Sequence, residues 1–396
     1  MGKKIKKGTK GDAALYITRS TALKKLKLSL KEFRRLCILK GVFPKEPKRK
    51  FKGQNKTYFL LKDIRFLAHE KLINKFREIN AFQKKINKAK TKTNKYDYKK
   101  LKDNKPIYSI QHIIKERYPR FADALNDIDD ALSLINLFSI LTKHDLHNIK
   151  SETVEECRRL NREFMLYLAV SQSVKRGFIS IKGIYLNTEI MGVDCTWLVP
   201  YAQPQKLPFE VDYEVMLTFL EVYTTLMKFV NLKLFKDIGL EYPPPKEFSD
   251  NPFFGYNSIQ IKNLQEQVKN RPKENDEIVP IDSEEMKKIQ KKSEKTEQIK
   301  SLFKNYVFYI GREVPREIFE LIISSCGGIF ADDSDESAFN EYSSEITHYI
   351  VDRPYESINF KSNKEYIQPQ WIFDCLNSNK ISLLLIIFLF LFYNLN

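Results

Sequence analysis

Residues 369–380 read PQWIFDCLNSNK, and they close a stretch in which apolar runs alternate with helical patterns. Trp371, Phe373 and Cys375 lie in the helix that this segment predicts, where the tryptophan supplies a large plate for packing a helix on a sheet. Apolar runs before it predict strands at 306–310 (YVFYI), 329–332 (IFAD), 347–351 (THYIV) and 365–368 (EYIQ). This alternation predicts a small α/β domain with a parallel sheet.

A helical pattern over residues 315–325 separates the first two of these strands. Gly327 and Gly328 follow it directly, and a pair of glycines lets the backbone turn tightly into the next strand. Residues 302–380 are therefore predicted to form one domain.

The chain before this domain has a different character. Residues 261–301 are rich in Lys, Glu, Gln and Asn, which predicts a charged linker. Residues 13–260 show helical spacing over most of their length and predict one mostly helical domain. Within it, FISIKGIYL (178–186) and VDCTWLV (193–199) flank a turn at Gly192 and predict a β-hairpin. The predicted fold class is α+β multidomain: a helical domain with a hairpin, then an α/β domain.

Several helix starts are marked by polar side chains. Ser29-x-x-Glu32 and Thr153-x-x-Glu156 have the spacing of a capping box, in which the two side chains satisfy each other's backbone N–H groups. Asp212 precedes a long apolar stripe and predicts the start of another helix.

The positive charge is concentrated at one end of the chain. The full sequence carries a net charge of +17. Residues 1–105 hold 34 Lys and Arg against 8 Asp and Glu, a net of +26, so residues 106–396 hold 33 against 42, a net of −9. Residues 1–12 form a Lys- and Gly-rich segment that we expect to be disordered. This asymmetry predicts a polyanionic partner for the first 105 residues.

Lysine and arginine side chains of this basic end are the candidate RNA ligands. They are Lys3, Lys4, Lys6, Lys7, Lys24, Lys25, Arg34, Arg35, Lys48, Arg49, Lys50, Lys84 and Lys85. A solvated charged face is the simpler interpretation of any single run, and Arg34 and Arg35 could instead pair with Glu32 or Asp63. Of the nearby aromatics, Phe59 is expected in the core, and Tyr96 and Tyr98 are candidates for stacking on bases.

Neither catalysis nor metal binding has support in the sequence. The five cysteines are scattered and odd in number, so neither a disulfide framework nor a zinc cluster is expected, and a reducing compartment fits best. Asp123, Asp127 and Asp130 share a helical face, but a solvated face explains them better than a metal site. His144 and His147 lack further ligands nearby. We therefore predict no enzyme activity, no cofactor and no metal.

The C-terminal domain resembles a BRCT domain, on the strength of the Gly327–Gly328 pair, Trp371 and the run PQWIFDCLNSNK. The whole chain resembles the Pescadillo family over residues 1–380. The resemblance rests on GTKGDAALYITRSTALKKLKLSLKEFRRLCILKGVFPKEPK, YPRFADALNDIDDAL, SIKGIYLNTEIMG, TWLVPY, GREVPRE, THYIVDRP and YIQPQWIFDCLN, in that order. Several long segments in order are far more specific than one short motif.

The resemblance to the Pescadillo family implies a scaffold for large ribosomal subunit assembly. It implies binding to precursor rRNA that still carries the second internal transcribed spacer. It also implies a trimeric complex with a Block-of-proliferation-type protein and a WD-repeat protein, within pre-ribosomal particles of the nucleolus and nucleoplasm. No small-molecule substrate is implied, and membrane association is not expected.

The resemblance to BRCT domains raises one alternative function. Many BRCT domains bind phosphopeptides through a Ser or Thr at the end of the first strand and a Lys on the second helix. Gly311 and Arg312 stand where that hydroxyl is expected, so the pocket is incomplete. Arg312 is either a docking residue or part of a structural ion pair. The alternative, a phosphopeptide adaptor in DNA-damage or cell-cycle signalling, is therefore disfavoured.

The last residues depart from the family. Residues 381–393 read ISLLLIIFLFLFY, where a polar and charged continuation is expected. The run is shorter than the roughly 17–20 residues of a membrane span. A tail anchor, apolar packing after the last helix, and translated non-coding sequence all stay open. The third is favoured because Lys exceeds Arg by 51 to 16, as in AT-rich coding sequence.

Overall fold

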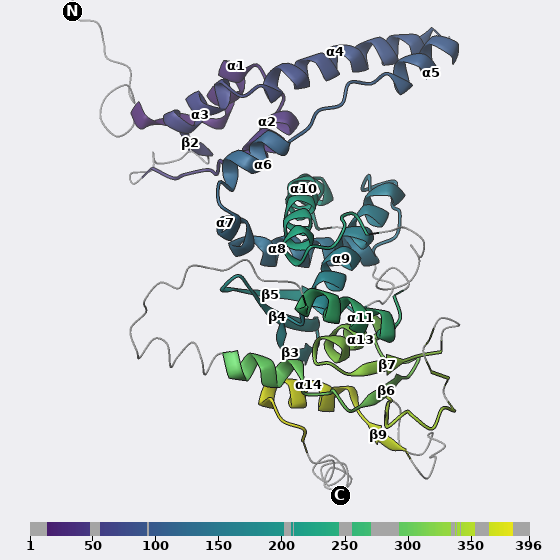
Figure 1. Cartoon of the computed structure of the whole chain (residues 1–396). Coiled ribbons are helices and arrows are strands. Elements are labelled where there is room, and N and C mark those ends of the chain that lie inside the picture. Colours follow the sequence, from purple (N-terminus) through teal and green to yellow (C-terminus); the bar gives the residue numbers. More distant parts are fainter. Residues whose placement is uncertain are drawn as a thin grey trace, which may run out of the picture. The chain divides into compact units, whose positions relative to one another are not determined.

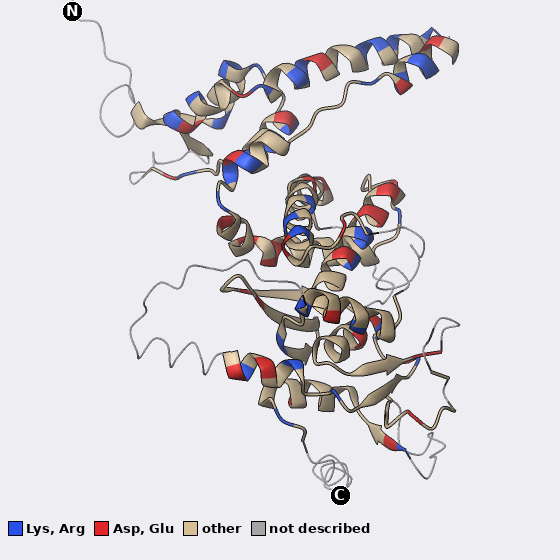
Figure 2. Cartoon of the chain, viewed as in Figure 1, with Lys and Arg blue, Asp and Glu red and all other residues tan. Residues whose placement is uncertain are grey.

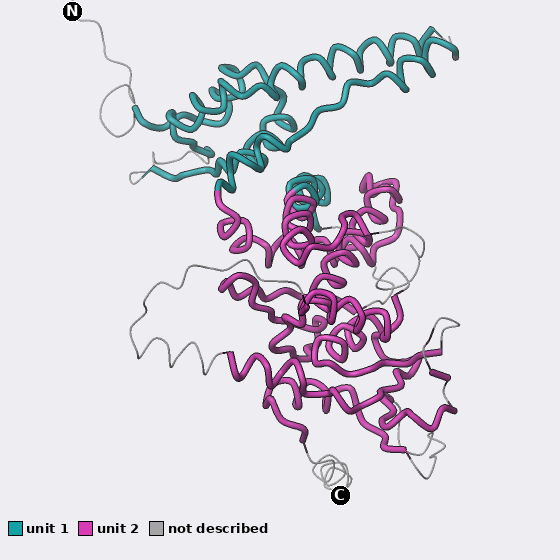
Figure 3. Tube along the Cα trace, viewed as in Figure 1, with its two compact units in different colours: residues 1–119, 211–225 teal, residues 120–210, 226–396 magenta. Residues whose placement is uncertain are grey.

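The computed structural model describes residues 14–47, 56–92, 95–201, 207–208, 210–244, 256–270, 293–333, 337, 339–340, 342–352 and 364–382 (Figure 1). Two compact units share the chain (Figure 3). Unit 1 comprises residues 1–119 and 211–225, and unit 2 comprises residues 120–210 and 226–396. The long helix α10 (Tyr213–Ile238) contributes its first half to unit 1 and its second half to unit 2. These units are defined by packing, whereas the boundaries near residues 260 and 302 rest on composition and stay a prediction.

Unit 1 is a set of helices with one small sheet. Its elements are β1 (Tyr16–Thr18), α1 (Arg19–Leu26), α2 (Leu30–Leu39), β2 (Tyr58–Leu60), α3 (Leu61–Ala68), α4 (Leu72–Thr91), α5 (Lys95–Asp103) and α6 (Gln111–Arg117). The capping box of Ser29 and Glu32 is confirmed at the start of α2. Phe59 packs edge-on against Phe33 at 5.3 Å in the core, as predicted, because β2 pairs with β1 and faces α2.

The first part of unit 2 combines helices with an antiparallel sheet. Its elements are α7 (Phe121–Asn126), α8 (Ile128–Ile140), α9 (Ser151–Ser171), β3 (Val174–Ser180), β4 (Gly183–Ile190), β5 (Val193–Val199), the second half of α10, and α11 (Ser258–Lys269). The predicted hairpin with its turn at Gly192 is present as β4 and β5, and β3 adds a third strand in the order β3-β4-β5. A turn at Ile181–Lys182 divides the stretch that alternation alone had assigned to one strand.

One helix start predicted in this region is wrong. Thr153 and Glu156 do not form a capping box, because α9 begins at Ser151 and Glu156 pairs with Lys228. Most of α11 lies within the stretch from residue 261 that the sequence assigns to a linker, and Ile261 is buried there. Asp212 does cap α10, since its carboxylate accepts the N–H of Val215 at 3.3 Å.

Side chains from neighbouring helices cover both edges of the β3-β4-β5 sheet. Along β5, the backbone N–H groups of Thr196 and Leu198 donate to Asp129 and Ser133 of α8, at 2.9 and 3.2 Å. Along β3, Gly177 donates its N–H to Asn377 at 3.2 Å and accepts from the same amide at 2.8 Å. Unpaired backbone groups at a sheet edge can pair with a strand of another chain. These contacts occupy some of the edge groups and so oppose such pairing.

The second part of unit 2 is the predicted α/β domain. Its elements are β6 (Val307–Ile310), α13 (Arg316–Ser325), β7 (Ile329–Ala331), β8 (His348–Ile350), β9 (Glu365–Ile367) and α14 (Pro369–Ser378). The four strands are parallel in the order β7-β6-β8-β9, which confirms the predicted fold class. Trp371 is fully buried among Phe303, Phe308 and His348.

This α/β domain packs on the end of α9 and on β3. Gln265 of α11 donates to the carbonyls of Ala169 at 2.8 Å and Ser324 at 3.0 Å, so it joins α9 to α13. The hydroxyl of Ser325 donates to Leu168 at 3.3 Å. Together with the partly buried contact of Asn377 with Gly177 on β3, these hydrogen bonds explain why both parts belong to one unit.

One helix among the described residues, α10, is long and apolar enough to cross a membrane by length and composition alone. A core helix passes the same test. Leu226, Val230 and Leu234 of α10 are buried, and Asn231 donates to the carbonyl of Leu160 at 3.1 Å. The apolar C-terminal run lies outside the described residues from position 383 onward.

We expect Gly327→Ala to destabilise unit 2 by about 2–3 kcal/mol. Gly327 has φ +79°, and a Cβ there would lie 2.6 Å from the carbonyl oxygen of Lys300. Gly192 is the matched control, because its φ of +81° is equally strained for alanine but nothing lies within 4 Å. Urea unfolding should show Gly192→Ala to be milder, at about 1 kcal/mol. Equal losses would mean that the close backbone approach at Gly327 contributes nothing.

Candidate nucleic-acid and protein-docking surfaces

The structure describes six of the predicted RNA ligands. Lys24 and Lys25 lie in the last turn of α1, Arg34 and Arg35 on α2, and Lys84 and Lys85 on α4. The remaining candidates, Lys3, Lys4, Lys6, Lys7, Lys48, Arg49 and Lys50, lie outside the described residues. In the ribbon of Figure 2, positions of Lys and Arg, in blue, are frequent along the helices of unit 1, most visibly along α4 and α5.

The two arginines of α2 differ in their surroundings. Arg34 is exposed, whereas Arg35 forms an ion pair with Glu221 of α10 at 2.5 Å and lies over the ring of Tyr108 at 5.3 Å. The partner is thus neither Glu32 nor Asp63, and Glu32 caps its own helix. Since a guanidinium already held by a carboxylate is less available to phosphate, Arg34 is the better ligand of the pair.

Two further lysines, Lys88 near the end of α4 and Lys92 at its cap, extend the candidate surface beyond Lys84 and Lys85. Lys84, Lys85, Lys88 and Lys92 are all exposed, and none of them has an acidic partner among the described residues. Counting with helical periodicity could have found Lys88 and Lys92, which follow Lys84 in steps of four. Tyr96 is 75% exposed on α5, whereas Tyr98 is half-buried. Tyr96 is therefore the better candidate for stacking.

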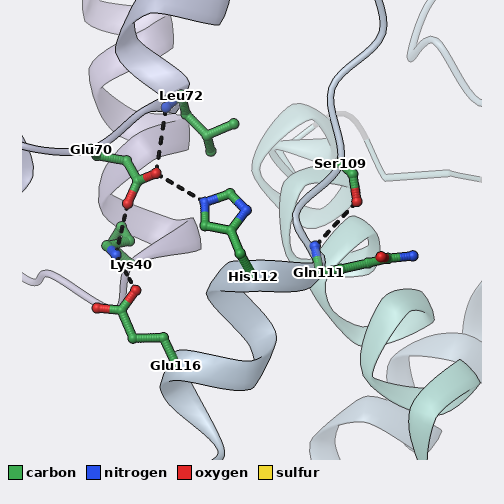
Figure 4. A network of polar contacts seen from close by, with 7 residues as sticks. All are labelled: Lys40, Glu70, Leu72, Ser109, Gln111, His112 and Glu116. Carbon is green, nitrogen blue, oxygen red and sulfur yellow. Dashed lines mark hydrogen bonds and ion pairs between the residues drawn. The ribbon is translucent and has the colours of Figure 1, made fainter.

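A buried polar network holds the base of α4 in place (Figure 4). Lys40, at the end of α2, donates to Glu70 at 2.8 Å and to Glu116 of α6 at 2.7 Å. Glu70, just before α4, also contacts His112 of α6 at 3.0 Å and accepts the N–H of Leu72 at 3.4 Å. One carboxylate thus joins the end of α2, the start of α4 and the helix α6.

The two buried charges of this network, on Lys40 and Glu70, are of opposite sign and form an ion pair. Lys40 and Glu70 are 5% and 6% exposed, so each needs the other to offset its lost hydration. Burial alone would raise the pKa of Glu70, but the hydrogen bonds from Lys40 and His112 outweigh it and lower that pKa to about 2. Glu70 therefore stays ionised at neutral pH and fixes the direction in which α4 leaves the rest of unit 1.

The end of strand β6 lacks the features of a phosphate pocket. A Cβ at Gly311 would lie 2.8 Å from the carbonyl of Ile350, so a Ser or Thr does not fit there without movement. Arg312 forms an ion pair with Asp333 and is 79% exposed. The structural ion pair weighed for Arg312 is thus present, and solvent screens it.

A second arginine of this region is also held by carboxylates. Arg316, at the start of α13, contacts both Glu320 and Asp332, which are nearly fully buried. Burial raises the pKa of Glu320 to about 8, with Arg316 opposing the shift. Asp332 and Asp333, which follow β7, thus form ion pairs with Arg316 and Arg312.

We expect the chain to capture a phosphorylated peptide and its plain counterpart equally well. Asp333→Asn removes the partner of Arg312 and should raise phosphate-dependent capture by less than about 2-fold, because solvent already screens this exposed pair. Glu345→Gln is a control, because it removes one exposed charge of the same domain without touching either arginine. Strong phosphate-dependent capture by the unaltered chain, measured by pulldown, would contradict this expectation and favour the adaptor function.

The described residues bring together no group of three or more His, Cys, Asp and Glu side chains that could hold a metal ion. Burial raises the pKa of all five cysteines, to about 12 for Cys37, Cys157 and Cys195. Such thiols stay protonated at neutral pH and are poor nucleophiles.

Comparison with known proteins agrees with this architecture. A family model described as Pescadillo N-terminus matches residues 6–276, and one described as BRCT domain matches residues 301–384. Proteins named Pescadillo homolog from Nematostella vectensis, Chlamydomonas reinhardtii and Arabidopsis thaliana are 43%, 41% and 39% identical. The matches cover 96%, 95% and 95% of this chain and 78%, 64% and 69% of those relatives. The chain therefore belongs to the Pescadillo family.

Proposed function

We propose that this chain is a ribosome-assembly scaffold required for maturation of large-subunit precursor rRNA. In this proposal unit 1 binds precursor rRNA, and other surfaces bind a Block-of-proliferation-type protein and a WD-repeat protein in a trimeric complex. The chain acts in pre-ribosomal particles of the nucleolus and nucleoplasm. It holds its partners together and carries out no chemical step.

The observation that carries the proposal is the separation of charge along the chain. A net of +26 lies within the first 105 residues, against −9 in the rest. In unit 1, Lys84, Lys85 and Lys88 of α4 are exposed and have no acidic partner among the described residues, so their charge is available to an external polyanion. Membership in the Pescadillo family supports RNA of the large subunit as that polyanion.

The packing of unit 2 supports a scaffold role. Buried hydrogen bonds through Gln265 and Ser325, and a partly buried pair through Asn377, join the BRCT domain to α9 and β3. A rigid composite of two domains presents several surfaces in a fixed arrangement. Several modest contacts made at once give strong overall binding, which is the physical basis of scaffolding.

Crosslinking the chain to RNA in cells, followed by sequencing of the bound fragments, tests this function. The proposal expects reads concentrated on large-subunit precursor rRNA. Reads spread over messenger RNA, or no recovered RNA, would overturn it.

A further inference from the structure

The hairpin formed by α4 and α5 is the most strongly basic structural feature of the described chain (Figure 2). Between residues 81 and 105 there are ten lysines and two aspartates, a net of +8. We propose that the outer side of this hairpin is a binding site for double-helical RNA, read through its phosphates. The inference rests on the proposed function and specifies where and how unit 1 holds RNA.

A ridge of lysines runs along one side of α4. Lys84, Lys88 and Lys92 follow one another in steps of four residues, so each step rises about 6 Å along the helix axis. Lys85 lies beside them, and Ile86, which is 6% exposed, marks the opposite side. The helix dipole is another reason for lysines in the last turn of a helix. It does not explain Lys84, which lies about two turns before the end of α4.

The ridge begins where the contacts of α4 with α1, α2 and the segment before α6 end. Phe76 packs on Tyr108 at 5.6 Å, Arg77 donates to the carbonyl of Leu26 at 3.2 Å, and Asn80 donates to Glu32. Beyond Asn80, the described hydrogen bonds of α4 side chains stay within the helix, as between Gln83 and Asn87. In Figures 1 and 3 this part of the hairpin extends outward from the other helices of unit 1. A long ligand can therefore lie along it.

The side chains of the hairpin favour a duplex over a single strand. Proteins that hold single strands stack successive bases on several aromatic rings. Tyr96 is the one aromatic residue in the exposed class within the described part of the hairpin, since Phe82 and Tyr98 are half-buried. Double-helical RNA is recognised mostly through phosphates and sugar hydroxyls, for which a lysine ridge suffices.

A membrane surface is the other polyanion that a basic helix can bind. Such helices insert an apolar face among the lipids. The apolar side of α4 is already covered, because Ile86 is buried and Phe82 and Ala89 are half-buried. A basic helix with no free apolar face favours RNA over a membrane surface as the polyanion.

Binding of the full chain to a 20-base-pair RNA duplex, over a range of salt, tests the inference. The triple variant Lys84→Gln/Lys88→Gln/Lys92→Gln should weaken binding roughly 10- to 100-fold. The slope of the logarithm of the association constant against the logarithm of salt concentration should become less negative by about 3. The matched control is Lys62→Gln/Arg65→Gln/Lys71→Gln, which removes the same charge from exposed residues of unit 1 outside the ridge. The control should change affinity by less than about 3-fold.

Three results would overturn the inference. One is equal loss in the two triple variants. Another is binding of one strand alone as tightly as of the duplex. The third is ridge-dependent binding to vesicles of phosphatidylcholine and phosphatidylserine that exceeds binding to the duplex. All three leave the proposed function standing if the chain binds RNA, whereas a chain that binds no RNA at all removes the proposed function itself.

Discussion

Replacing Trp371 with alanine should lower the free energy of unfolding of unit 2 by about 3–5 kcal/mol. The Trp371 side chain projects from α14 and is fully buried. It packs against the rings of Phe303 and Phe308. Its indole N–H also donates to the carbonyl of Ser382 at 3.1 Å. Truncation leaves a large cavity that these rigid neighbours fill only in part. Urea unfolding followed by far-UV circular dichroism measures the loss.

Two further variants make the result specific. Trp371→Phe keeps most of the ring and should lose less than half as much as Trp371→Ala. Tyr342→Ala removes an aromatic ring that is 81% exposed in the same domain, and it should stay within about 0.5 kcal/mol of the unaltered chain. Losses of similar size for Trp371→Ala and Tyr342→Ala would show that Trp371 does not anchor the domain.

Replacing Glu70 with glutamine should destabilise unit 1 by about 2–3 kcal/mol. The change leaves the buried ammonium of Lys40 with Glu116 as its remaining partner, and Glu116 is half exposed. The control is Glu78→Gln, because Glu78 forms an exposed pair with Lys75 and should cost less than about 0.5 kcal/mol. Equal effects of the two changes would contradict a central role for the Lys40–Glu70 pair.

The same carboxylate predicts the response of unit 1 to acid. Its pKa falls from an ordinary 4.5 to about 2 on folding, so the unfolded chain takes up this proton first as the pH drops. The contribution of Glu70 to stability is therefore complete above about pH 5 and is lost between about pH 5 and pH 2. Glu70→Gln should remove this part of the acid dependence. An unchanged profile between pH 5 and pH 2 would show that another group carries it.

Much of the fold follows from local patterns in the sequence. In the BRCT domain the strands, the helix over 315–325 and the Gly327 turn lie within one or two residues of their predicted positions, because each is short, apolar and bounded by clear turn residues. The hairpin turn at Gly192 was predicted correctly, but the single strand predicted over residues 178–186 is interrupted by a turn at Ile181 and Lys182. Alternation continues through those residues, and an isolated turn of this kind has no strong sequence signal. The short strands β1 and β2 were missed because three residues give too little pattern.

The surfaces were predictable in kind but not in detail. Composition pointed to a basic end, and this end is where α4 and α5 present their lysines. The pairing of Arg35 with Glu221 was not predictable, because the two residues are 186 positions apart and meet only through the fold. The Lys40–Glu70–Glu116 network has the same origin, since it joins three segments distant in sequence.

The central claim is that the lysines of unit 1 bind the phosphates of precursor rRNA. The most direct test is to measure how binding of the full chain to a fragment of large-subunit precursor rRNA depends on salt concentration. Binding through the lysines of unit 1 predicts that the logarithm of the association constant falls linearly with the logarithm of salt concentration, with a slope of about −3 or steeper. A slope near zero, or tight binding that persists when the basic residues of unit 1 are neutralised, would contradict the account.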